Sequence, residues 1–200
     1  MTAEAVAPTR PPRTRRARTP TLLQMEAADC GAASLGIVLG YYGRYVPLED
    51  LRIACGVSRD GSKAVNVVKA ARAYAMEARG YKYELHELHN ARPPFIIFWN
   101  FNHFLVVEGF GRHVVYLNDP ATGPRQVTYE EFDRSYTGVT LTLSPGPGFT
   151  KSRKPETVLG ALLPRLNHSR QALVYVILVG LGLVAPGLAI PSFGRLFVDD

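Results

Sequence analysis

The sequence predicts an α+β domain in which helices come first and an antiparallel sheet follows. Two observations support this order. Apolar residues recur at helical spacing up to about residue 74, and from residue 95 onward short β-branched or aromatic runs alternate with Gly, Asn and Pro. The composition agrees, because a chain of 200 residues that is 46% hydrophobic and 20% charged is not wholly disordered, a collagen or a coiled coil.

The first half of the domain is expected to hold three helices. Asp29 can cap a helix that runs to about Gly40, because Ala, Leu, Ile and Val recur along this stretch and Gly ends it. Pro47 suits the first turn of a short second helix that continues to about Ile53. A third helix is predicted over residues 63–74, where valines and alanines fall on one face.

The second half is expected to form the sheet. Its β-branched and aromatic runs are residues 95–99, 103–110, 114–118, 125–128 and 139–143. Gly, Asn and Pro separate these runs, which is typical of turns between antiparallel strands. One short helix, residues 129–136 with Thr128 as its cap, is predicted to interrupt the sheet.

Residues 1–20 form an arm rich in Arg, Pro, Thr and Ala, and we expect this arm to be disordered because it lacks apolar periodicity. It holds five arginines and one glutamate, so it accounts for four of the six net positive charges of the chain. The small basic excess that remains does not indicate a phosphate-binding face, and nucleic acid is not expected as a partner. The arm is either an inert solvated tail or a tether to a membrane surface or nucleic acid.

Residues 21–145 make up the predicted folded domain, and a Pro-Gly-Pro-Gly run from residue 145 to 148 ends it. Residues 146–169 are expected to form a basic linker. Within this linker, residues 158–166 are amphipathic and suit either a membrane surface or a short packed helix.

Residues 170–200 contain the candidate for a first transmembrane helix. From residue 171 to 194, 24 consecutive residues have no charge, and a helix of that length reaches roughly 36 Å, longer than a bilayer core of about 30 Å. Pro186 and Pro191 would kink this helix or mark its exit, and a buried core helix is the alternative. Basic residues precede the span, which places the folded domain in the cytoplasm. Because the chain stops just after it, we expect the front part of a longer membrane protein.

The candidate for a reactive side chain is Cys30, at the predicted start of the first helix. A helix N-terminus favours a thiolate, and Gly31 beside it leaves room for a substrate backbone. Gln24 lies six residues upstream, where its side-chain amide and the Cys30 backbone N–H could form an oxyanion hole. Taken alone, Cys30 would be better explained as a small buried residue of an Ala-rich helix.

His103 and Asp119 favour a chemical role for this cysteine. His103 begins one apolar strand and Asp119 ends the next, so antiparallel pairing across the turn at residues 109–111 would bring the two side chains together. Cys, His and a carboxylate in this order, on a chain with helices first, fit a papain-like cysteine protease, in which the carboxylate orients the histidine base. Taken singly, His103 would be a core or edge histidine and Asp119 a turn cap.

Three further signals are weaker. Residues 56–63 imitate a phosphate-binding loop, but Ser62 and Lys63 stand in the wrong order and no strand precedes them, so ATP is not expected here. His86 and His89 lack the further ligands that a metal site needs, and no metal is expected. Cys55 is predicted to be a small core residue, and two cysteines suit a reducing compartment.

Together these motifs resemble the C39 peptidase domain of bacterial peptidase-containing ABC transporters, which export bacteriocin and lanthipeptide-type precursors. The matching residues, all in order between 21 and 143, are Gln24, Asp29–Ala33, Asn102–Phe104 with Val106 and Val107, Asn118–Gly123, Glu131–Phe132 and Thr137–Val139. Asn118–Gly123 and the Pro-Gly-Pro-Gly-Phe ending most resemble the branch that handles nitrile-hydratase-like leader peptides. Ser34 departs from the pattern, because many relatives have a second Cys there.

This resemblance implies a papain-like fold and a thiol protease that removes leaders from ribosomally made precursors after a Gly-Gly or Gly-Ala type pair. Cys30 would be the nucleophile, His103 the general base and acid, Asp119 the orienting group and Gln24 the oxyanion donor.

The implied partners are the precursor peptide, the bacterial inner membrane and the remaining transporter domains, assembled as a homodimer. ATP would bind only to a nucleotide-binding domain outside these residues, and no cofactor is expected within them. The alternative function is a non-catalytic module that docks the leader for an exporter.

Overall fold

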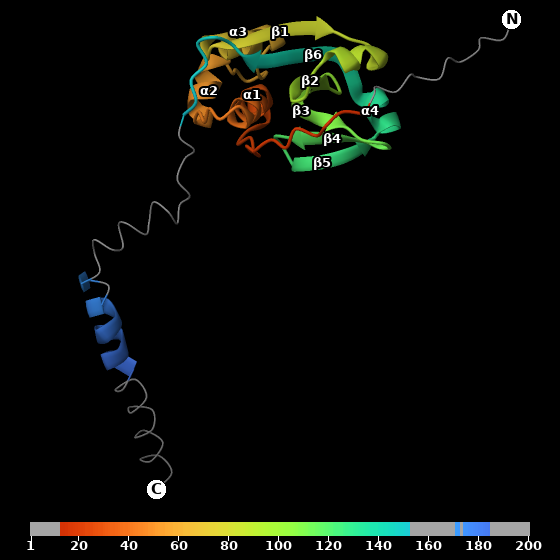
Figure 1. Cartoon of the computed structure of the whole chain (residues 1–200). Coiled ribbons are helices and arrows are strands. Elements are labelled where there is room, and N and C mark those ends of the chain that lie inside the picture. The colour runs from red at the N-terminus through yellow and green to blue at the C-terminus, as the bar shows by residue number, and fades with distance from the viewer. Residues whose placement is uncertain (1–12, 153–170, 173, 185–200) are drawn as a thin grey trace, which may run out of the picture. The chain divides into compact units, whose positions relative to one another are not determined.

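The computed structural model describes residues 13–152, 171–172 and 174–184. The chain divides into two compact units, Met1–Lys154 and Pro155–Asp200, and each is described by itself. In the first unit, the three N-terminal helices gather at one side of a six-stranded antiparallel sheet (Figure 1). This is the predicted α+β arrangement, with helices first and sheet second.

Three helices form the N-terminal half, as predicted: α1 (Cys30–Tyr41), α2 (Leu48–Ala54) and α3 (Ala64–Ala73). Ten of the twelve residues of α1 are buried, so this helix is the centre of the helical layer. Its small residues make close packing possible, since a Cβ added at Gly36 would lie 2.8 Å from Leu51 of α2. The first helix is therefore surrounded by protein on most of its circumference.

The six strands are β1 (Met76–Lys82), β2 (Phe95–Trp99), β3 (His103–Phe110), β4 (Val114–Asp119), β5 (Gly123–Thr128) and β6 (Tyr136–Pro145). They pair antiparallel in the order β1-β6-β2-β3-β4-β5, so β6 inserts between β1 and β2. β1 is not among the predicted strands. It is an edge strand of mostly polar sequence in which only Met76 and Ala78 are buried, which conceals its strand character.

Three shorter helical segments complete the first unit. The predicted helix after β5 is α4 (Tyr129–Ser135), and its Thr128 cap accepts a hydrogen bond from the Glu131 N–H at 3.2 Å. Two 3₁₀ turns, η1 (Ala27–Asp29) and η2 (Leu85–Asn90), precede α1 and β2.

Alternate residues of β3 face two separate cores. Phe104 and Val106 pack with the layer of α1, α2 and α3, whereas Leu105 and Val107 pack on the opposite face of the sheet with residues of α4. Because both faces are covered, β3 is apolar along most of its length. The pairing of β3 with β4 places Val106 opposite Asn118, so the first residue of β3 and the last of β4 meet at one end of the sheet.

Residues 13–20 of the arm lie against β3, although composition predicts disorder up to residue 20. The Ala17 N–H donates to the Glu108 carbonyl at 2.7 Å. The buried Glu108 carboxylate accepts a hydrogen bond from the Thr19 N–H at 2.8 Å and forms an ion pair with Arg16 at 2.6 Å. The expected disorder does not extend to these residues, because a partner about 90 positions away holds them. Residues 1–12 lie outside the described residues.

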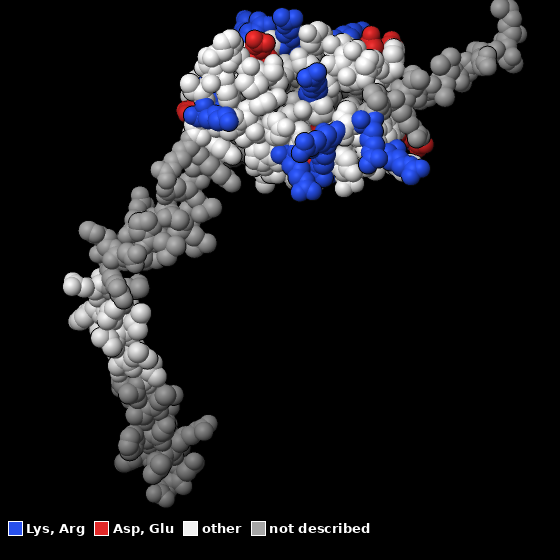
Figure 2. Space-filling view, in the orientation of Figure 1, with Lys and Arg blue, Asp and Glu red and all other residues white. Residues whose placement is uncertain are grey.

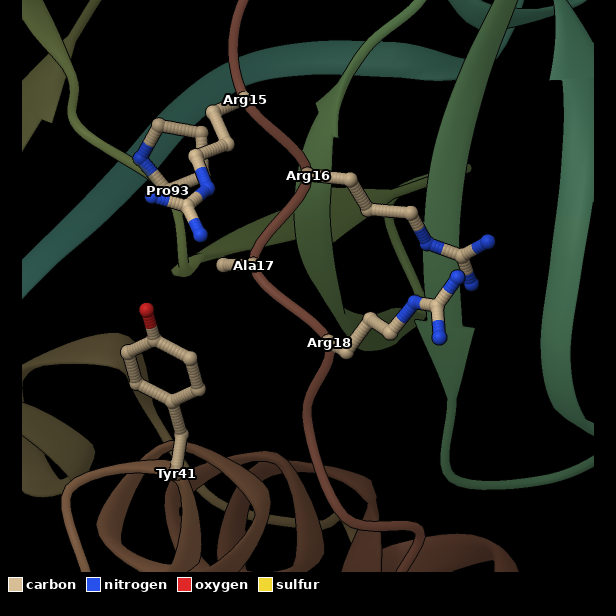
Figure 3. A pocket seen from close by; sticks show the side chains of 6 residues that line it. All are labelled: Arg15, Arg16, Ala17, Arg18, Tyr41 and Pro93. Atoms are coloured by element: carbon tan, nitrogen blue, oxygen red, sulfur yellow. The ribbon is translucent and has the colours of Figure 1, made fainter.

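A hollow of about 630 Å³ lies between this arm and the C-terminal end of α1. Arg15, Pro93 and Tyr41 lie on one side of the arm, whereas Arg16 and Arg18 extend to the other (Figure 3). Lys and Arg side chains gather where the arm crosses the sheet, with uncharged surface between the groups (Figure 2). Tyr41 is the last residue of α1, so about 16 Å of helix separates the hollow from the first residue of α1.

In the second unit, residues 171–172 and 174–184 are helical, and their side chains are exposed. No helix in the described part of the chain is both long and apolar enough to cross a membrane. The predicted amphipathic segment at 158–166 lies outside the described residues, and so does the part of the predicted span that follows residue 184.

Candidate active site

Cys30 is the first residue of α1 and is only 4% exposed. At this position the free N–H groups and the positive end of the helix dipole favour a thiolate. Asp29 was expected to cap the helix, but its side chain makes no cap hydrogen bond to α1. Its carboxylate instead accepts from the Glu26 N–H at 2.9 Å, because the two residues form a capping box that closes η1. The turn before the cysteine, rather than the helix itself, uses this carboxylate.

Arg52 of α2 holds the same turn from outside. Its Nε lies 3.0 Å from Asp29 Oδ1 and its terminal nitrogen 3.3 Å from Glu26 Oε2. The Asp29 side chain is fully buried, so the guanidinium compensates a charge that has no access to water. The residue directly before the thiol is thereby fixed by an ion pair that the sequence did not reveal.

His103 and Asp119 meet at the end of the sheet, as the strand pairing predicts. His103 Nε2 lies 2.7 Å from Asp119 Oδ1. The same carboxylate accepts from the Ala121 N–H at 2.9 Å and forms an ion pair with Arg125 Nε at 3.2 Å. The side chains of Cys30 and His103 also interact, and each shifts the pKa of the other. Because Nε2 is engaged by Asp119, Nδ1 is the ring nitrogen that remains for the thiol.

Charge in this cluster is shifted towards an ion pair. Burial raises the pKa of the Cys30 thiol, but hydrogen bonds with His103 and with the backbone of Phe104 and Gly31 outweigh it, and the pKa falls below the ordinary 9.0. Burial lowers the pKa of His103, yet Asp119 and Cys30 raise it from 6.5 to about 9. The pKa of Asp119 falls below 3.8, since the effect of burial is outweighed chiefly by the hydrogen bond with His103. These shifts favour a thiolate beside an imidazolium at neutral pH.

Gln24 is fixed to this cluster through its main chain. Its N–H donates to the carbonyl of Pro120, the residue after Asp119, at 2.9 Å. Its side-chain Oε1 is buried without a hydrogen-bond partner among the described residues. The segment that carries Gln24 and Cys30 therefore lies beside the end of β4, which is where the predicted oxyanion group has to be.

A cleft of about 350 Å³ opens beside Cys30. It is lined by Cys30, Ala27 and Ala28, by Arg59, Asp60, Gly61 and Ser62, and by Phe98, Phe101, Asn102 and Phe104. A Cβ added at Gly31 would overlap Ser62 Oγ and lie 3.1 Å from Val67 Cγ2, so Ser62 packs closely against the start of α1. Sequence reasoning considered the loop over residues 56–63 only as a phosphate-binding imitation, because its place beside the thiol depends on tertiary contact.

Of the weaker sequence signals, His86, His89 and Cys55 do not line this cleft. His86 and His89 are on the exposed turn η2, where His89 Nδ1 contacts the His86 carbonyl at 2.6 Å. Within the described residues, no group of three or more His, Cys, Asp or Glu could hold a metal ion. Cys55 is fully buried, as predicted, and burial raises the pKa of its thiol to about 12.

The family model described as Peptidase C39 family matches residues 18–148. This chain belongs to the peptidase C39 family. Among its curated relatives, the Colicin V secretion/processing ATP-binding protein CvaB of Escherichia coli is 30% identical over 91% of this chain and 26% of CvaB. The transport/processing ATP-binding protein ComA of Streptococcus pneumoniae is 31% identical over 79% of this chain and 23% of ComA. The C39 chain thus spans about a quarter of the length of these relatives.

Solved structures share the architecture of this C39 domain. A double glycine motif protease from an AMS/PCAT transporter, in complex with the leader peptide, is 56% identical with a TM-score of 0.64, and the match covers 65% of this chain and 94% of that one. The peptidase domain of Streptococcus ComA is 26% identical with a TM-score of 0.59, covering 62% and 96%. The C39 domain therefore has the α+β papain-like fold predicted from the sequence.

Proposed function

We propose that this C39 domain is a cysteine endopeptidase that removes leader peptides after a Gly-Gly or Gly-Ala type pair. The observation that carries the proposal is the cluster of Cys30, His103 and Asp119, in which a thiol of lowered pKa contacts an imidazole of raised pKa that lies 2.7 Å from a carboxylate. Cys55, a buried cysteine without such partners, has its pKa shifted in the opposite direction. The similarity to a double glycine motif protease supports the substrate class.

In the proposed mechanism, the Cys30 thiolate attacks the carbonyl carbon of the second small residue. The oxyanion accepts hydrogen bonds from the Cys30 backbone N–H and the Gln24 amide. The His103 imidazolium gives its proton to the departing amine as the C–N bond breaks, which leaves the leader as a thioester on Cys30. His103 then takes a proton from water, the resulting hydroxide attacks the thioester, and the leader leaves with a free carboxylate while the thiolate is restored. Asp119 keeps Nε2 protonated and orients the ring throughout.

The cleft supports selection of small residues. Ser62, which lines the cleft, lies so close to Gly31 that an added Cβ would overlap its Oγ, so protein atoms are tightly packed directly beside the thiol. A peptide with glycine at the scissile pair avoids a Cβ of its own in this space and gains access that larger residues lack. We propose that this tight packing is the physical basis of the preference for a Gly-Gly or Gly-Ala type pair.

We also propose that the domain acts within an exporter. The relatives named above are secretion or transport/processing ATP-binding proteins about four times as long as this chain. Residues 170–200 would form the first span of the bacterial inner membrane, the peptidase domain would lie in the cytoplasm, and the complete transporter would be a homodimer whose other domains bind ATP. Its precursors would have nitrile-hydratase-like leaders, a proposal supported by the sequence from Asn118 to Gly123.

Mass spectrometry of a precursor peptide with a Gly-Gly leader, incubated with the chain, tests the activity. We expect one cut, after the pair, by the wild type and none by the Cys30→Ala variant. Binding of the leader without any cut by the wild type would support the non-catalytic docking module instead. A cut that persists in Cys30→Ala would refute the assignment of the nucleophile.

A further inference from the structure

Phe101 occupies an unusual position in the turn between β2 and β3. The Asn102 N–H donates to the Trp99 carbonyl at 3.1 Å, and the two residues between them, Asn100 and Phe101, have φ angles of 47° and 57°. Two successive residues with positive φ are the signature of a type I′ hairpin turn, in which Asn is favoured first and Gly second. Phenylalanine therefore stands where this turn favours glycine.

The fold gives no reason for an aromatic ring there. Phe101 is 79% exposed, and within the described residues its ring has no recorded contact with another ring or a cation. By contrast, the rings of Phe98 and Phe104 pack against each other with centroids 4.7 Å apart. A left-handed backbone conformation costs free energy at a phenylalanine, and strained positions of this kind cluster at functional sites.

The ring lies at the cleft that contains Cys30. Phe101 lines this cleft together with the aromatic residues Phe98 and Phe104, and the polar residues Arg59 and Asp60 line the same cleft. A peptide in the cleft would therefore meet both aromatic carbon and charged groups. Its apolar side chains would be favoured against the aromatic rings, where contact excludes water.

We infer that Phe101 is a specificity-determining residue, whose ring packs against an apolar side chain of the peptide next to the small-residue pair. This inference rests on the proposed function and adds to it a second preference besides small residues. It also explains why phenylalanine stands where the turn favours glycine. A glycine would suit the turn better but would leave the bound side chain of the peptide exposed to water.

A substrate panel tests the contact. The probes are Gly-Gly precursor peptides with Leu or Ser at each of the two positions on either side of the pair, and kcat/KM is measured with the 200-residue chain. For the wild type we expect about a tenfold preference for Leu over Ser at one of these positions, as one apolar contact in a pocket provides. Phe101→Ala and Phe101→Gly should lose that preference, while Ile53→Ala should keep it, since Ile53 is also 80% exposed but does not line the cleft.

Thermal unfolding separates a binding role from a structural one. Phe101→Gly converts the turn to Asn-Gly, so its melting temperature should rise by a few degrees while its preference for Leu disappears. A variant that loses stability together with activity would show that Phe101 serves the fold, and would overturn the inference. The alkaline limb of the pH profile should stay unchanged in these variants, because it reports His103, two residues away.

A probe that needs no peptidase activity distinguishes failure of this inference from failure of the proposed function. Alkylation of Cys30 by N-phenyl iodoacetamide, relative to iodoacetamide, should be several-fold slower in Phe101→Ala than in the wild type. If no Gly-Gly precursor is cut but this difference holds, the proposed function fails and the apolar contact stands. If neither the Leu preference nor the alkylation ratio changes in Phe101→Ala, the inference is wrong.

Discussion

Replacement of Asp119 separates the charge of this residue from its geometry. Asp119→Asn keeps an oxygen that can accept from His103 Nε2 and the Ala121 N–H but removes the negative charge, whereas Asp119→Ala removes both. In the wild type the pKa of His103 is raised from 6.5 to about 9, and the hydrogen bond with Asp119 is the leading cause of the rise, against the opposing effect of burial. A rise of that size corresponds to ~3 kcal/mol in favour of the imidazolium, to which Cys30 also contributes.

The assay is the pH profile of kcat/KM for a Gly-Gly precursor. In the wild type we expect activity to fall as the pH rises through about 9, where His103 loses its proton. In Asp119→Asn this limb should move down by about 1 pH unit or more, the range of an adjacent opposite charge, and stop short of 6.5 because the Cys30 thiolate remains. At pH 7 a limb above 6.5 leaves at least about a quarter of His103 protonated, so we expect activity at most about fourfold lower in Asp119→Asn, and about 100-fold lower in Asp119→Ala, in which the ring also loses its orientation.

The free energy of unfolding should also depend on pH through the pKa shifts of His103 and Asp119. The folded-state pKa of His103 lies above its unfolded value, so its contribution is fully present below pH 6.5 and is lost as the pH rises through about 9. The pKa of Asp119 is lowered, so its contribution is present above about pH 3.8 and is lost as the pH falls further. Thermal unfolding at pH 6 and pH 9.5 should therefore differ less in Asp119→Asn than in the wild type. An alkaline limb that stays near 9 in Asp119→Asn would refute the claim that this carboxylate raises the pKa of His103.

Three further predictions concern the surroundings of the thiol. Arg52→Gln leaves the buried carboxylate before the nucleophile without its ion pair, so kcat/KM for the precursor should fall about tenfold or more; unchanged activity would show that this ion pair does not position the turn. Gly31→Ala should nearly abolish cleavage, because its Cβ overlaps Ser62 Oγ, and Ser62→Gly in the same chain should restore part of the activity. If activity does not recover, the overlap with Ser62 is not the cause of the loss. Iodoacetamide at pH 7 should label Cys30 much faster than Cys55, whose pKa is raised to about 12; peptide mapping that finds equal labelling would contradict both pKa shifts.

Local sequence was sufficient for most helices and strands. The spacing of apolar residues predicted α1, α2 and α3, and β-branched and aromatic runs predicted β2 and β3 with the bounds that the structure shows. Both signals arise from the period of one helix or strand, so neighbouring residues are enough to reveal them. β1 was missed because its residues are mostly polar and its partner, β6, is about 60 residues away.

Some features of the candidate site could likewise be predicted from local sequence, whereas others could not. The order of Cys30, His103 and Asp119 along the chain, at a helix start and at two strand ends, could be predicted because a hairpin register brings such ends together. The pairing of Arg52 with Asp29, by contrast, joins α2 to the turn before α1, and no local pattern announces it. Asp29 could be judged only as a helix cap from sequence, and the structure shows that it serves the preceding turn.

What the sequence alone determined is therefore most of the elements and the approximate meeting point of His103 and Asp119, since these follow from periods and from the pairing of adjacent strands. Only the tertiary structure decided which strands flank which, that residues 13–20 are bound by Glu108, and that residues 59–62 line a cleft together with Cys30 and Phe101. These features depend on contacts between residues far apart in the chain. Their free energy comes from burial and charge pairing that exist only once the sheet and the helical layer have packed together.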